Sequence, residues 1–256
     1  MSIKNFKLSI GHLYPKELNL YGDWGNIESL IYRCVNRRIG VEVTNIDAST
    51  ARSEVFKRAD IFFMGGGPDS IQKNIFKDFL FSKGPYIKEC FLKNKVGLFI
   101  CGAYQLLGNY YRPYFGEDIK GLGLVDFYTE HFGRDSKRCV GNVVVDISNL
   151  NINTSFSRYL VGFENHGGNT FLGPKRPLLG SVKKGFGNNR KDKTEGIHVR
   201  NFFGSYLHGP LLPKNPHFSD HLISLALNLK YKDNIKLVPL DDSLELIAHK
   251  SALILK

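Results

Sequence analysis

The 256-residue chain has few cysteines and no long hydrophobic run. Its four cysteines are widely spaced and form no CxxC pair. This spacing argues against a structural disulfide set and against a zinc site, and it favours a reducing compartment. No apolar run approaches the roughly 20 residues that span a bilayer, and the N-terminal segment shows neither the apolar core nor the cleavage site of a signal peptide. These absences predict a cytoplasmic protein without a metal or a membrane span.

Negative charge is also scarce. The chain has 35 lysines and arginines against 24 acidic residues, which gives a formal net charge of +11. This excess suits an anionic partner, an anionic membrane surface or an acidic substrate, or it simply solubilises the surface. The densest basic stretch, residues 175–193, is interleaved with glycine, proline and asparagine, as in a solvated loop. The sequence has no helix-turn-helix, zinc or base-stacking pattern, so nucleic acid binding is not expected.

A regular alternation of strand and helix patterns fills the first half of the chain. Strands are expected at 6–10, 41–46, 59–64 and 96–100, and helices at 27–38, 70–81 and 86–94. Two of these strands, ADIFFM and VGLFI, are continuous apolar runs, which is typical of strands buried on both faces of a parallel sheet. The alternation predicts an α/β fold with a mostly parallel sheet flanked by helices.

The second half of the chain has a different pattern. Strands are expected at 122–130, 139–147, 159–163 and 202–207, and closing helices at 220–229 and 243–249. Polar and glycine-rich loops separate these strands, which predicts an antiparallel extension. No internal repeat, low-complexity tract or linker is found. We therefore expect one domain over 1–256, with a core at about 5–230 and a C-terminal helical extension at 231–256.

Cys101 stands between the strand at 96–100 and a helix-like segment that begins with Gly102 and Ala103. A strand–turn–helix elbow of this kind exposes a nucleophile at a sharp turn. The small residues after the cysteine allow backbone N–H groups to approach a developing oxyanion. The other three cysteines fit inert core positions. The pattern therefore predicts that Cys101 is a catalytic nucleophile.

Two histidines at expected strand ends are candidates for the matching base. His208 and His166 are rivals on these grounds. The glycine run at 65–67 also follows a strand. It lacks the lysine and spacing of a phosphate loop, so it is either an oxyanion loop or a flexible turn. If the strands are parallel neighbours, the glycine run, Cys101 and His208 meet at the carboxyl edge of the sheet.

Several motifs resemble those of class I glutamine amidotransferases, in the branch that includes cobyric acid synthase. They run in order along the chain: LNLY and GN at 18–26, IFFMGGG at 61–67, ICGAYQ at 100–105, GLG at 121–123, DFYTE at 126–130, GFENHGG at 162–168, GFGNN at 185–189 and GSYLHGP at 204–210. Within this branch the motifs are most similar to those of glutaminase subunits that serve lipid II amidation. Residues beyond about 215 carry little of the resemblance.

The resemblance implies a flavodoxin-like domain and assigns roles to matching residues. Cys101 would be the nucleophile, and His208 would be the general acid and base. His166 belongs to a family motif but would not be the catalytic histidine. Gln105 matches the glutamine that follows the nucleophile.

The resemblance also implies how the substrate is held. Gly66 or Gly67, together with the backbone N–H of Gly102, would form the oxyanion hole. Arg138 matches an arginine implicated in binding the substrate glutamine, and Arg134 is its rival for that role. No metal ligand is implied.

Two positions depart from the usual class I pattern. Pro210 stands two residues after His208, where the pattern has a glutamate. The carboxylate that orients the histidine must therefore come from elsewhere, be absent, or be supplied by a partner subunit. The cobyric branch shares this lack. Phe99 stands two residues before Cys101, where the pattern has a glycine, and its bulk changes how the strand packs at the elbow.

The resemblance also implies the reaction, the partner and the cofactors of the chain. It would hydrolyse glutamine to glutamate and ammonia and pass the ammonia, within a heterodimer, to a MurT-type Mur ligase that amidates the D-glutamate of lipid II in peptidoglycan synthesis. The chain would hold no cofactor, and ATP would bind to the ligase. The positive charge is compatible with work at the inner face of the membrane. The alternatives are a glutaminase for a corrinoid amidation of the cobyric acid type and a non-catalytic scaffold on the same fold.

Overall fold

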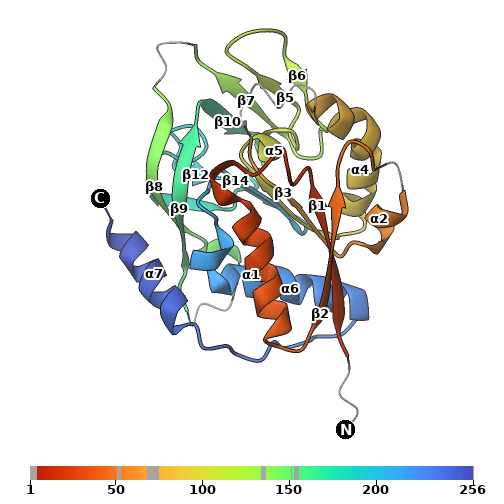
Figure 1. The fold of residues 1–256 in the computed structure, drawn as a ribbon. Helices are drawn as coiled ribbons and strands as arrows, with labels where there is room; N and C mark the ends of the chain where they lie inside the picture. Colours follow the sequence, from red (N-terminus) through yellow and green to blue (C-terminus); the bar gives the residue numbers. More distant parts are fainter. Residues whose placement is uncertain are drawn as a thin grey trace.

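A computed structural model describes residues 5–50, 53–67, 75–133, 137–150, 152 and 156–255. At its centre lies a six-stranded sheet with the strand order β13-β14-β4-β3-β1-β2 (Figure 1). Its strands are β1 (Lys7–Leu13), β2 (Gly40–Ile46), β3 (Ile61–Met64), β4 (Val96–Ile100), β13 (Ile197–Val199) and β14 (Phe202–Ser205). Neighbouring strands are parallel except for the antiparallel pair of β13 and β14. The expected mostly parallel sheet is confirmed.

Helices flank this sheet. They are α1 (Trp24–Val35), α2 (Ser53–Arg58), α4 (Gly84–Leu92), α5 (Gly102–Gln105) and α6 (Pro216–Tyr231), with 3₁₀ turns η1 (Leu20–Gly22), η3 (Ser148–Leu150) and η4 (Leu212–Lys214) and a π-helix, η2 (Phe79–Lys83). Helix α1 packs against α6, and α2 packs against α4. The expected helix at 70–81 falls partly on residues 70–74, which lie outside the described residues, and it ends in η2.

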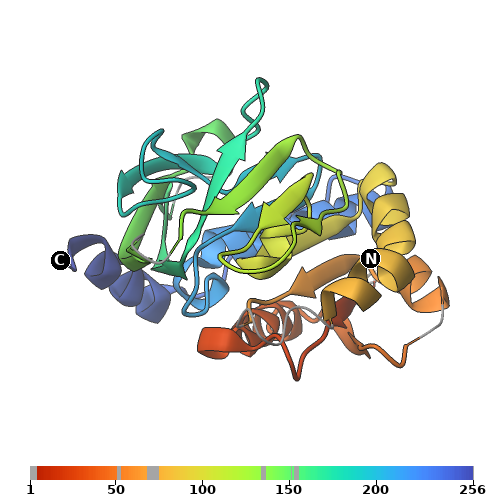
Figure 2. The same cartoon turned by 90° about the horizontal axis from the view of Figure 1, so that it is seen from above.

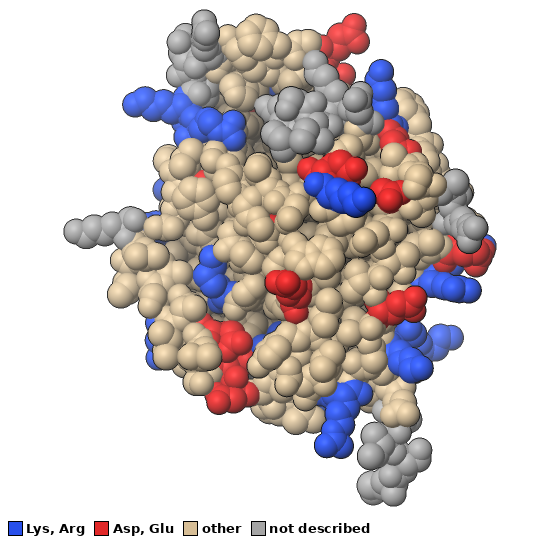
Figure 3. Space-filling model, viewed as in Figure 1, with Lys and Arg blue, Asp and Glu red and all other residues tan. Residues whose placement is uncertain are grey.

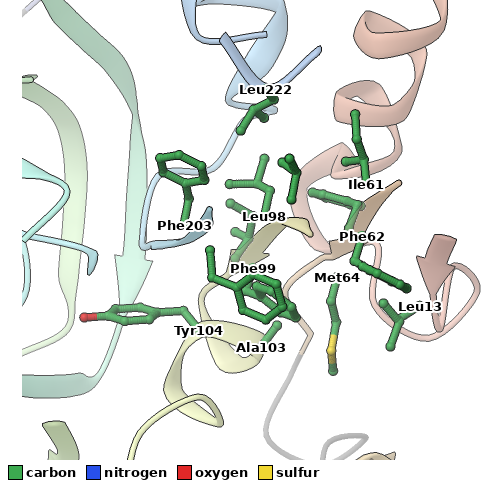
Figure 4. Packing of buried hydrophobic residues seen from close by; sticks show 14 of the residues in the cluster. Leu13, Ile61, Phe62, Met64, Leu98, Phe99, Ala103, Tyr104, Phe203 and Leu222 are labelled. Carbon is green, nitrogen blue, oxygen red and sulfur yellow. The ribbon is translucent and has the colours of Figure 1, made fainter. Parts of the chain in front are cut away.

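The central strands are apolar throughout because both of their faces are covered. Every residue of β3 and β4 is buried. Figure 4 shows Leu98 and Phe99 of β4 in the same cluster as Phe203 of β14 and Leu222 of α6. The edge strand β2 has exposed and partly buried residues instead. The strands that lead to the candidate site are therefore the most completely packed ones.

Two four-stranded sheets form the second half of the fold (Figure 2). One has the order β10-β7-β5-β6 and contains β5 (Tyr110–Arg112), β6 (Ile119–Lys120), β7 (Phe127–His131) and β10 (Gly168–Leu172). The other has the order β12-β11-β8-β9 and contains β8 (Cys139–Asp146), β9 (Tyr159–His166), β11 (Gly180–Lys184) and β12 (Thr194–Glu195). Their strand pairs are antiparallel except for β5 and β7. The expected antiparallel extension is confirmed.

The strand expected at 122–130 forms only from Phe127 onward. The Leu122 N–H donates to the Leu106 carbonyl at 2.7 Å, and Gly123 has a positive φ of 60°. These features fold the backbone back onto the segment after α5, where an extended strand cannot form. The prediction was therefore wrong for the first residues of this range.

The strand expected at 202–207 also ends early. The Tyr206 N–H donates to the buried carboxylate of Glu195 at 2.8 Å instead of to a neighbouring strand. His208 then pairs with Phe163 of β9 in an isolated antiparallel bridge. This bridge, and not the parallel sheet, holds the backbone at His208.

The C-terminal segment is tied to the body of the fold by a largely buried ion cluster. Arg33 of α1 contacts Asp220 of α6 and Asp242, each at 2.6 Å. Asp242 directly precedes α7 (Ser243–Ile254), which lies within the helical extension expected at 231–256. Among the described residues, no helix has both the length and the apolar character needed to cross a membrane.

The surface charge is dispersed on the face shown in Figure 3. Basic side chains are spread over this face, and acidic side chains lie among them. The whole chain has a net charge of +11, but its basic residues do not form one continuous patch on this face.

Candidate active site

The candidate catalytic groups lie at the carboxyl ends of neighbouring parallel strands. Strands β14, β4, β3 and β1 are adjacent in the sheet. Cys101 directly follows β4, the glycine run at 65–67 follows β3, and His208 lies beyond β14. Asp23, at the start of α1, reaches the same edge from β1. A Cβ placed on Gly66 would lie 2.8 Å from His208 Cε1 and 3.2 Å from Cys101 Cβ, so the three segments meet as expected.

Cys101 forms a sharp backbone elbow. Its φ is 53° and its ψ is −111°, a conformation that residues with a side chain rarely adopt. Its N–H donates to the Ser205 carbonyl of β14 at 2.8 Å, and its own carbonyl accepts the Gln105 N–H at 3.0 Å. The strand and α5 therefore hold the elbow from both sides. The N–H of Gly102, the first of α5, has no acceptor within the helix.

Phe99 stands where the class I pattern has a glycine, and the structure accommodates it below the elbow. Its ring is fully buried and packs against Phe202 of β14, with 5.1 Å between the ring centroids. Gly97 provides the room, because a Cβ there would lie 2.6 Å from the Phe99 ring and 3.0 Å from the Phe202 ring. The large side chain is thus compatible with the positive φ at Cys101.

His208 faces a buried carboxylate. Its Nδ1 lies 3.7 Å from Asp23 Oδ1, and both side chains are fully buried. Burial alone lowers the pKa of His208, but the Asp23 carboxylate and the Cys101 thiol outweigh it, so the pKa is raised above its ordinary value. Tyr21 covers the imidazole edge-on, with 5.0 Å between the ring centroids. The surroundings therefore favour a protonated imidazole next to the thiol.

Sequence reasoning missed Asp23. An aspartate just before a helix is usual as an N-cap, and this ordinary role conceals any other. In the structure the Trp24 N–H is instead capped by Asn19 Oδ1 at 2.8 Å, and Asp23 Oδ2 accepts the Gly66 N–H at 2.7 Å. The signal in the sequence was an acidic residue between the LNLY and GN motifs that carry the family resemblance.

The glycine run lies beside the thiol, and the Gly66 N–H is already engaged. The Gly66 N–H donates to Asp23, and the Gly66 carbonyl accepts the Leu20 N–H at 3.1 Å. Gly66 and Gly67 were both expected to share the oxyanion hole with Gly102. In this conformation the Gly66 N–H is bound to a carboxylate and does not point at an open site.

A cavity of about 260 Å³ opens onto Cys101. It is lined by Leu20, Tyr21, Gly67, Cys101, Gln105, Tyr111, His131, Arg138, Asn165, His166, Gly167 and Gly168. Four of the predicted site residues share this wall: Gly67, Cys101, Gln105 and Arg138. The other predicted residues do not line it but adjoin Cys101. Arg134, the rival of Arg138, lies outside the described residues.

Arg138 is fixed on the cavity wall by Asn165. The Arg138 Nε donates to Asn165 Oδ1 at 2.9 Å, and its Nη2 donates to the Asn165 carbonyl at 3.1 Å. Asn165 in turn donates to the hydroxyl of Tyr21. The guanidinium is therefore held in place from β9 and from η1, and it supplies positive charge to the cavity.

Gln105 belongs to a buried chain of polar side chains behind the cavity. Its Nε2 donates to the Tyr206 hydroxyl at 3.1 Å. The Tyr206 and Thr170 hydroxyls lie 2.7 Å apart, and those of Thr170 and Thr129 lie 2.8 Å apart. These contacts fix the orientation of the Gln105 amide at the cavity wall.

His166 also lines the cavity, but its electrostatic setting differs from that of His208. It stacks on Tyr206 with 3.7 Å between the ring centroids. Its Nε2 lies 3.6 Å from Glu164 Oε2, but the two Glu164 oxygens accept the N–H groups of Phe186 and Gly187 at 2.6 and 2.9 Å. Burial is the largest influence and lowers the pKa of His166. A neutral imidazole is therefore favoured there.

A larger cavity, of about 700 Å³, lies beside α6 and the segment that leads to α7. None of the predicted site residues lines it. Cys101, Gln105, Gly67 and Arg138 line the smaller cavity instead. Within the described ranges, no cluster of three or more histidine, cysteine, aspartate or glutamate side chains is arranged to hold a metal ion.

Comparison with known proteins identifies the class of this protein. Residues 9–216 match the CobB/CobQ-like glutamine amidotransferase domain, and the chain belongs to that family. A relative from Staphylococcus aureus (strain N315), named lipid II isoglutaminyl synthase (glutamine-hydrolyzing) subunit GatD, is 41% identical over 224 residues, which are 88% of this chain and 86% of the relative. A relative of the same name from Streptococcus pneumoniae (strain ATCC BAA-255 / R6) is 38% identical over 240 residues, 93% of this chain and 88% of the relative.

The fold is also shared with solved structures. A crystal structure of a glutamine amidotransferase matches with a TM-score of 0.56, covering 85% of this chain and 98% of the other. The two sequences are 14% identical, so this likeness concerns the fold alone. It agrees with the parallel sheet and helices described above.

Proposed function

We propose that this chain is the glutaminase subunit of a lipid II isoglutaminyl synthase. It hydrolyses glutamine to glutamate and ammonia and passes the ammonia to a second subunit. The observation that carries the proposal is the similarity to two relatives with this name over most of both chains. The Cys101 elbow beside His208 supplies the chemistry that such a subunit needs.

Cys101 is the nucleophile of the proposed reaction. Its thiolate attacks the side-chain amide carbon of glutamine, and the amide oxygen takes up negative charge. The raised pKa of His208 supports this step, because a protonated imidazole stabilises the thiolate beside it. The Gly102 N–H and an N–H of the glycine run stabilise the oxyanion. Either Gly67 supplies the latter, or Gly66 exchanges its bond to Asp23 for one to the oxyanion.

His208 is the general acid and then the general base. It gives its proton to the departing nitrogen, so that ammonia leaves and a thioester remains on Cys101. Water then attacks the thioester carbon while the neutral imidazole takes one of its protons. The thiolate then leaves, and the new side-chain carboxylic acid loses the remaining proton of that water to solvent, which gives glutamate. The starting thiolate and imidazolium are restored.

Arg138 and Gln105 bind the substrate in this proposal. The cavity of about 260 Å³ is smaller than the about 300–1,000 Å³ of pockets for drug-sized ligands, which suits a single amino acid. The Arg138 guanidinium lines this cavity and pairs with the α-carboxylate of glutamine. Gln105, held by Tyr206, lines the same cavity, and its backbone N–H donates to the Cys101 carbonyl at 3.0 Å.

The second subunit of the proposed synthase is a MurT-type ATP-dependent ligase in a heterodimer with this chain. The relatives are named as subunits, which supports an assembly of more than one chain. The ligase binds ATP and lipid II and amidates the D-glutamate of its peptide, whereas this chain holds no cofactor. This chain is then one amidotransferase domain over 1–256, in the cytoplasm and near the inner face of the membrane.

The test is glutamate release from glutamine by the chain, alone and with its ligase subunit. Wild type is expected to release glutamate. The Cys101→Ala variant should lose at least about 10⁴-fold in kcat, because the thioester cannot form. The same complex should keep amidation driven by added ammonia, because the ligase active site is untouched. Cys90→Ala, which changes a buried thiol away from the cavity, is the matched control.

Three outcomes would contradict the proposal. Glutamate release that survives Cys101→Ala would show a different nucleophile. Folded wild-type protein that releases no glutamate with or without the ligase would favour the non-catalytic scaffold. Ammonia-dependent amidation of a corrinoid, and not of lipid II, by the assembled complex would move the acceptor to the cobyric acid type.

A further inference from the structure

The Asp23 and His208 side chains each have an unsatisfied buried atom facing the other. Asp23 Oδ1 and His208 Nδ1 lie 3.7 Å apart, and both side chains are fully buried. Neither atom has a hydrogen-bond partner within the described residues. Burying a polar atom without a hydrogen-bond partner costs free energy. Because the carboxylate oxygen and the imidazole nitrogen face each other, this cost favours their pairing.

Asp23 is rigidly placed for such a pairing. Its Oδ2 accepts the Gly66 N–H at 2.7 Å, and its carbonyl accepts both the backbone N–H and the side-chain Nδ2 of Asn26 at 3.0 Å. Gly65 also allows the close approach, because a Cβ there would lie 3.0 Å from Asp23 Oδ2. Asn19 caps the first N–H of α1, which leaves Asp23 Oδ1 available for the histidine.

The groups around His208 identify Asp23 as the acidic partner. Cys101 reaches the imidazole from the elbow, and Tyr21 packs on it from η1. His166 of β9 interacts with its charge and is itself favoured as neutral. Pro210, which occupies the position of the glutamate in the usual class I pattern, has no acidic group to offer.

We infer that Asp23 is the positioning residue of the catalytic histidine. Its Oδ1 accepts the Nδ1 proton of His208, which leaves Nε2 to exchange a proton with the Cys101 thiol and the departing nitrogen. The inference rests on the proposed glutaminase function. Closing the distance from 3.7 Å to a hydrogen bond requires a shift of about 1 Å, which is common when a site tightens around its substrate. The carboxylate then comes from this chain, and no residue of the ligase subunit is needed for it.

Asp23→Asn tests this assignment without changing the shape of the side chain. The amide oxygen can still accept the Gly66 N–H, but the negative charge beside His208 is gone. We expect kcat for glutamine to fall at least about 100-fold, with KM changed less than about threefold. The basic limb of the pH profile should move to lower pH by at least about one unit, because the imidazolium loses its stabilising carboxylate and deprotonates earlier.

Asp60→Asn is the matched control. Asp60 Oδ2 also accepts a backbone N–H, that of Ser9 at 2.8 Å, but it lies just before the N-terminal end of β3, away from the cavity. This variant should keep the wild-type rate and pH profile. A fall in the rate of Asp23→Asn without any shift of the profile would reduce Asp23 to a support for the glycine run and would overturn the inference.

Nuclear magnetic resonance of the wild-type imidazole gives a readout that needs neither turnover nor a variant. The Nδ1 proton of His208 should be present and should resonate far downfield, as protons shared with a carboxylate do. Its absence in wild type would overturn the assignment even if Asp23→Asn failed to fold. If this signal is present but wild type releases no glutamate, the proposed function fails and the Asp23–His208 pair stands.

Discussion

The parallel sheet and the antiparallel half contribute to the candidate site in different ways. The parallel strands β1, β3, β4 and β14 deliver Asp23, the glycine run, Cys101 and His208 to one edge, mostly through the backbone positions that follow each strand. The antiparallel half contributes part of the cavity wall, including β9 and the segment before β8, where Asn165 holds Arg138. In the proposed reaction bond breaking belongs to the parallel edge, and substrate binding is shared between Gln105 of that edge and Arg138 of the antiparallel wall.

The two buried histidines show the same contrast in electrostatic terms. The exposed fraction of His208 is 0% and that of His166 is 1%, yet their pKa values are shifted in opposite directions. Asp23 keeps an oxygen without a partner toward His208, whereas both oxygens of Glu164 accept backbone N–H groups beside His166. Both carboxylates favour the protonated imidazole beside them, but burial outweighs the effect of Glu164 on the pKa of His166, whereas Asp23 and Cys101 together outweigh burial at His208.

Gly66→Ala should give the largest effect on the parallel edge. The new Cβ would lie 2.8 Å from His208 Cε1 and 3.2 Å from Cys101 Cβ, so the catalytic pair must separate. We expect kcat to fall about 100-fold or more, because displacement of reacting groups by about 1 Å costs this much. Steady-state kinetics with glutamine measure it. Gly40→Ala is the control and should leave kcat unchanged, because its Cβ would lie 3.0 Å from the flexible Lys7 side chain and at an ordinary contact distance of 3.6 Å from the Phe6 carbonyl.

Arg138→Ala, on the antiparallel wall, should give the second-largest loss of activity toward glutamine. Loss of the guanidinium is expected to raise KM for glutamine roughly tenfold, the cost of one charged hydrogen bond, with kcat changed less than about threefold. Arg138→Lys should not restore KM, because a lysine cannot make the paired contacts to Asn165. A fall in kcat without a change in KM would mean that Arg138 acts in bond breaking and not in substrate binding. The two regions would then not have the different roles described above.

Tyr21→Phe should give the smallest effect, because it removes one bond between the two regions. The Tyr21 hydroxyl accepts the side-chain N–H of Asn165, which positions Arg138. We expect KM to rise about two- to fivefold, the range for one partly exposed neutral hydrogen bond. The phenyl ring should still cover His208, so kcat and the pH profile are expected to match wild type. A changed pH profile would mean that the hydroxyl itself acts on His208.

The parallel half could be predicted from the sequence because its signals are local. Apolar runs marked β3 and β4, and Cys101 followed its strand directly. The second half of the chain was less predictable because hydrogen bonds to loops and side chains interrupt the expected strands. Tyr206 leaves the expected strand to bond Glu195, and Leu122 folds back onto Leu106; neither contact has a local signature.

The candidate site shows the same limit. The pattern around Cys101 predicted a nucleophile, and the family resemblance favoured His208 over His166, but the role inferred for Asp23 depends on a contact across more than a hundred and eighty positions of sequence. The accommodation of Phe99 was equally hidden, since it depends on the room that Gly97 leaves within the same strand. Complementary volumes and long-range ion contacts arise from packing, which a single sequence does not display.

The four cysteines differ enough in their surroundings that chemical labelling of Cys101 can measure the fraction of molecules with a formed active site. Burial raises the pKa of Cys34 to about 12 and that of Cys90 to about 11, and it also raises the pKa of Cys139. Only thiolates react readily with alkylating reagents, so these three thiols should react slowly in the folded protein. Cys101 alone among the four lines the cavity. A glutamine-like electrophile should therefore label one equivalent per chain, and the labelled fraction would report how much of a preparation has a formed site.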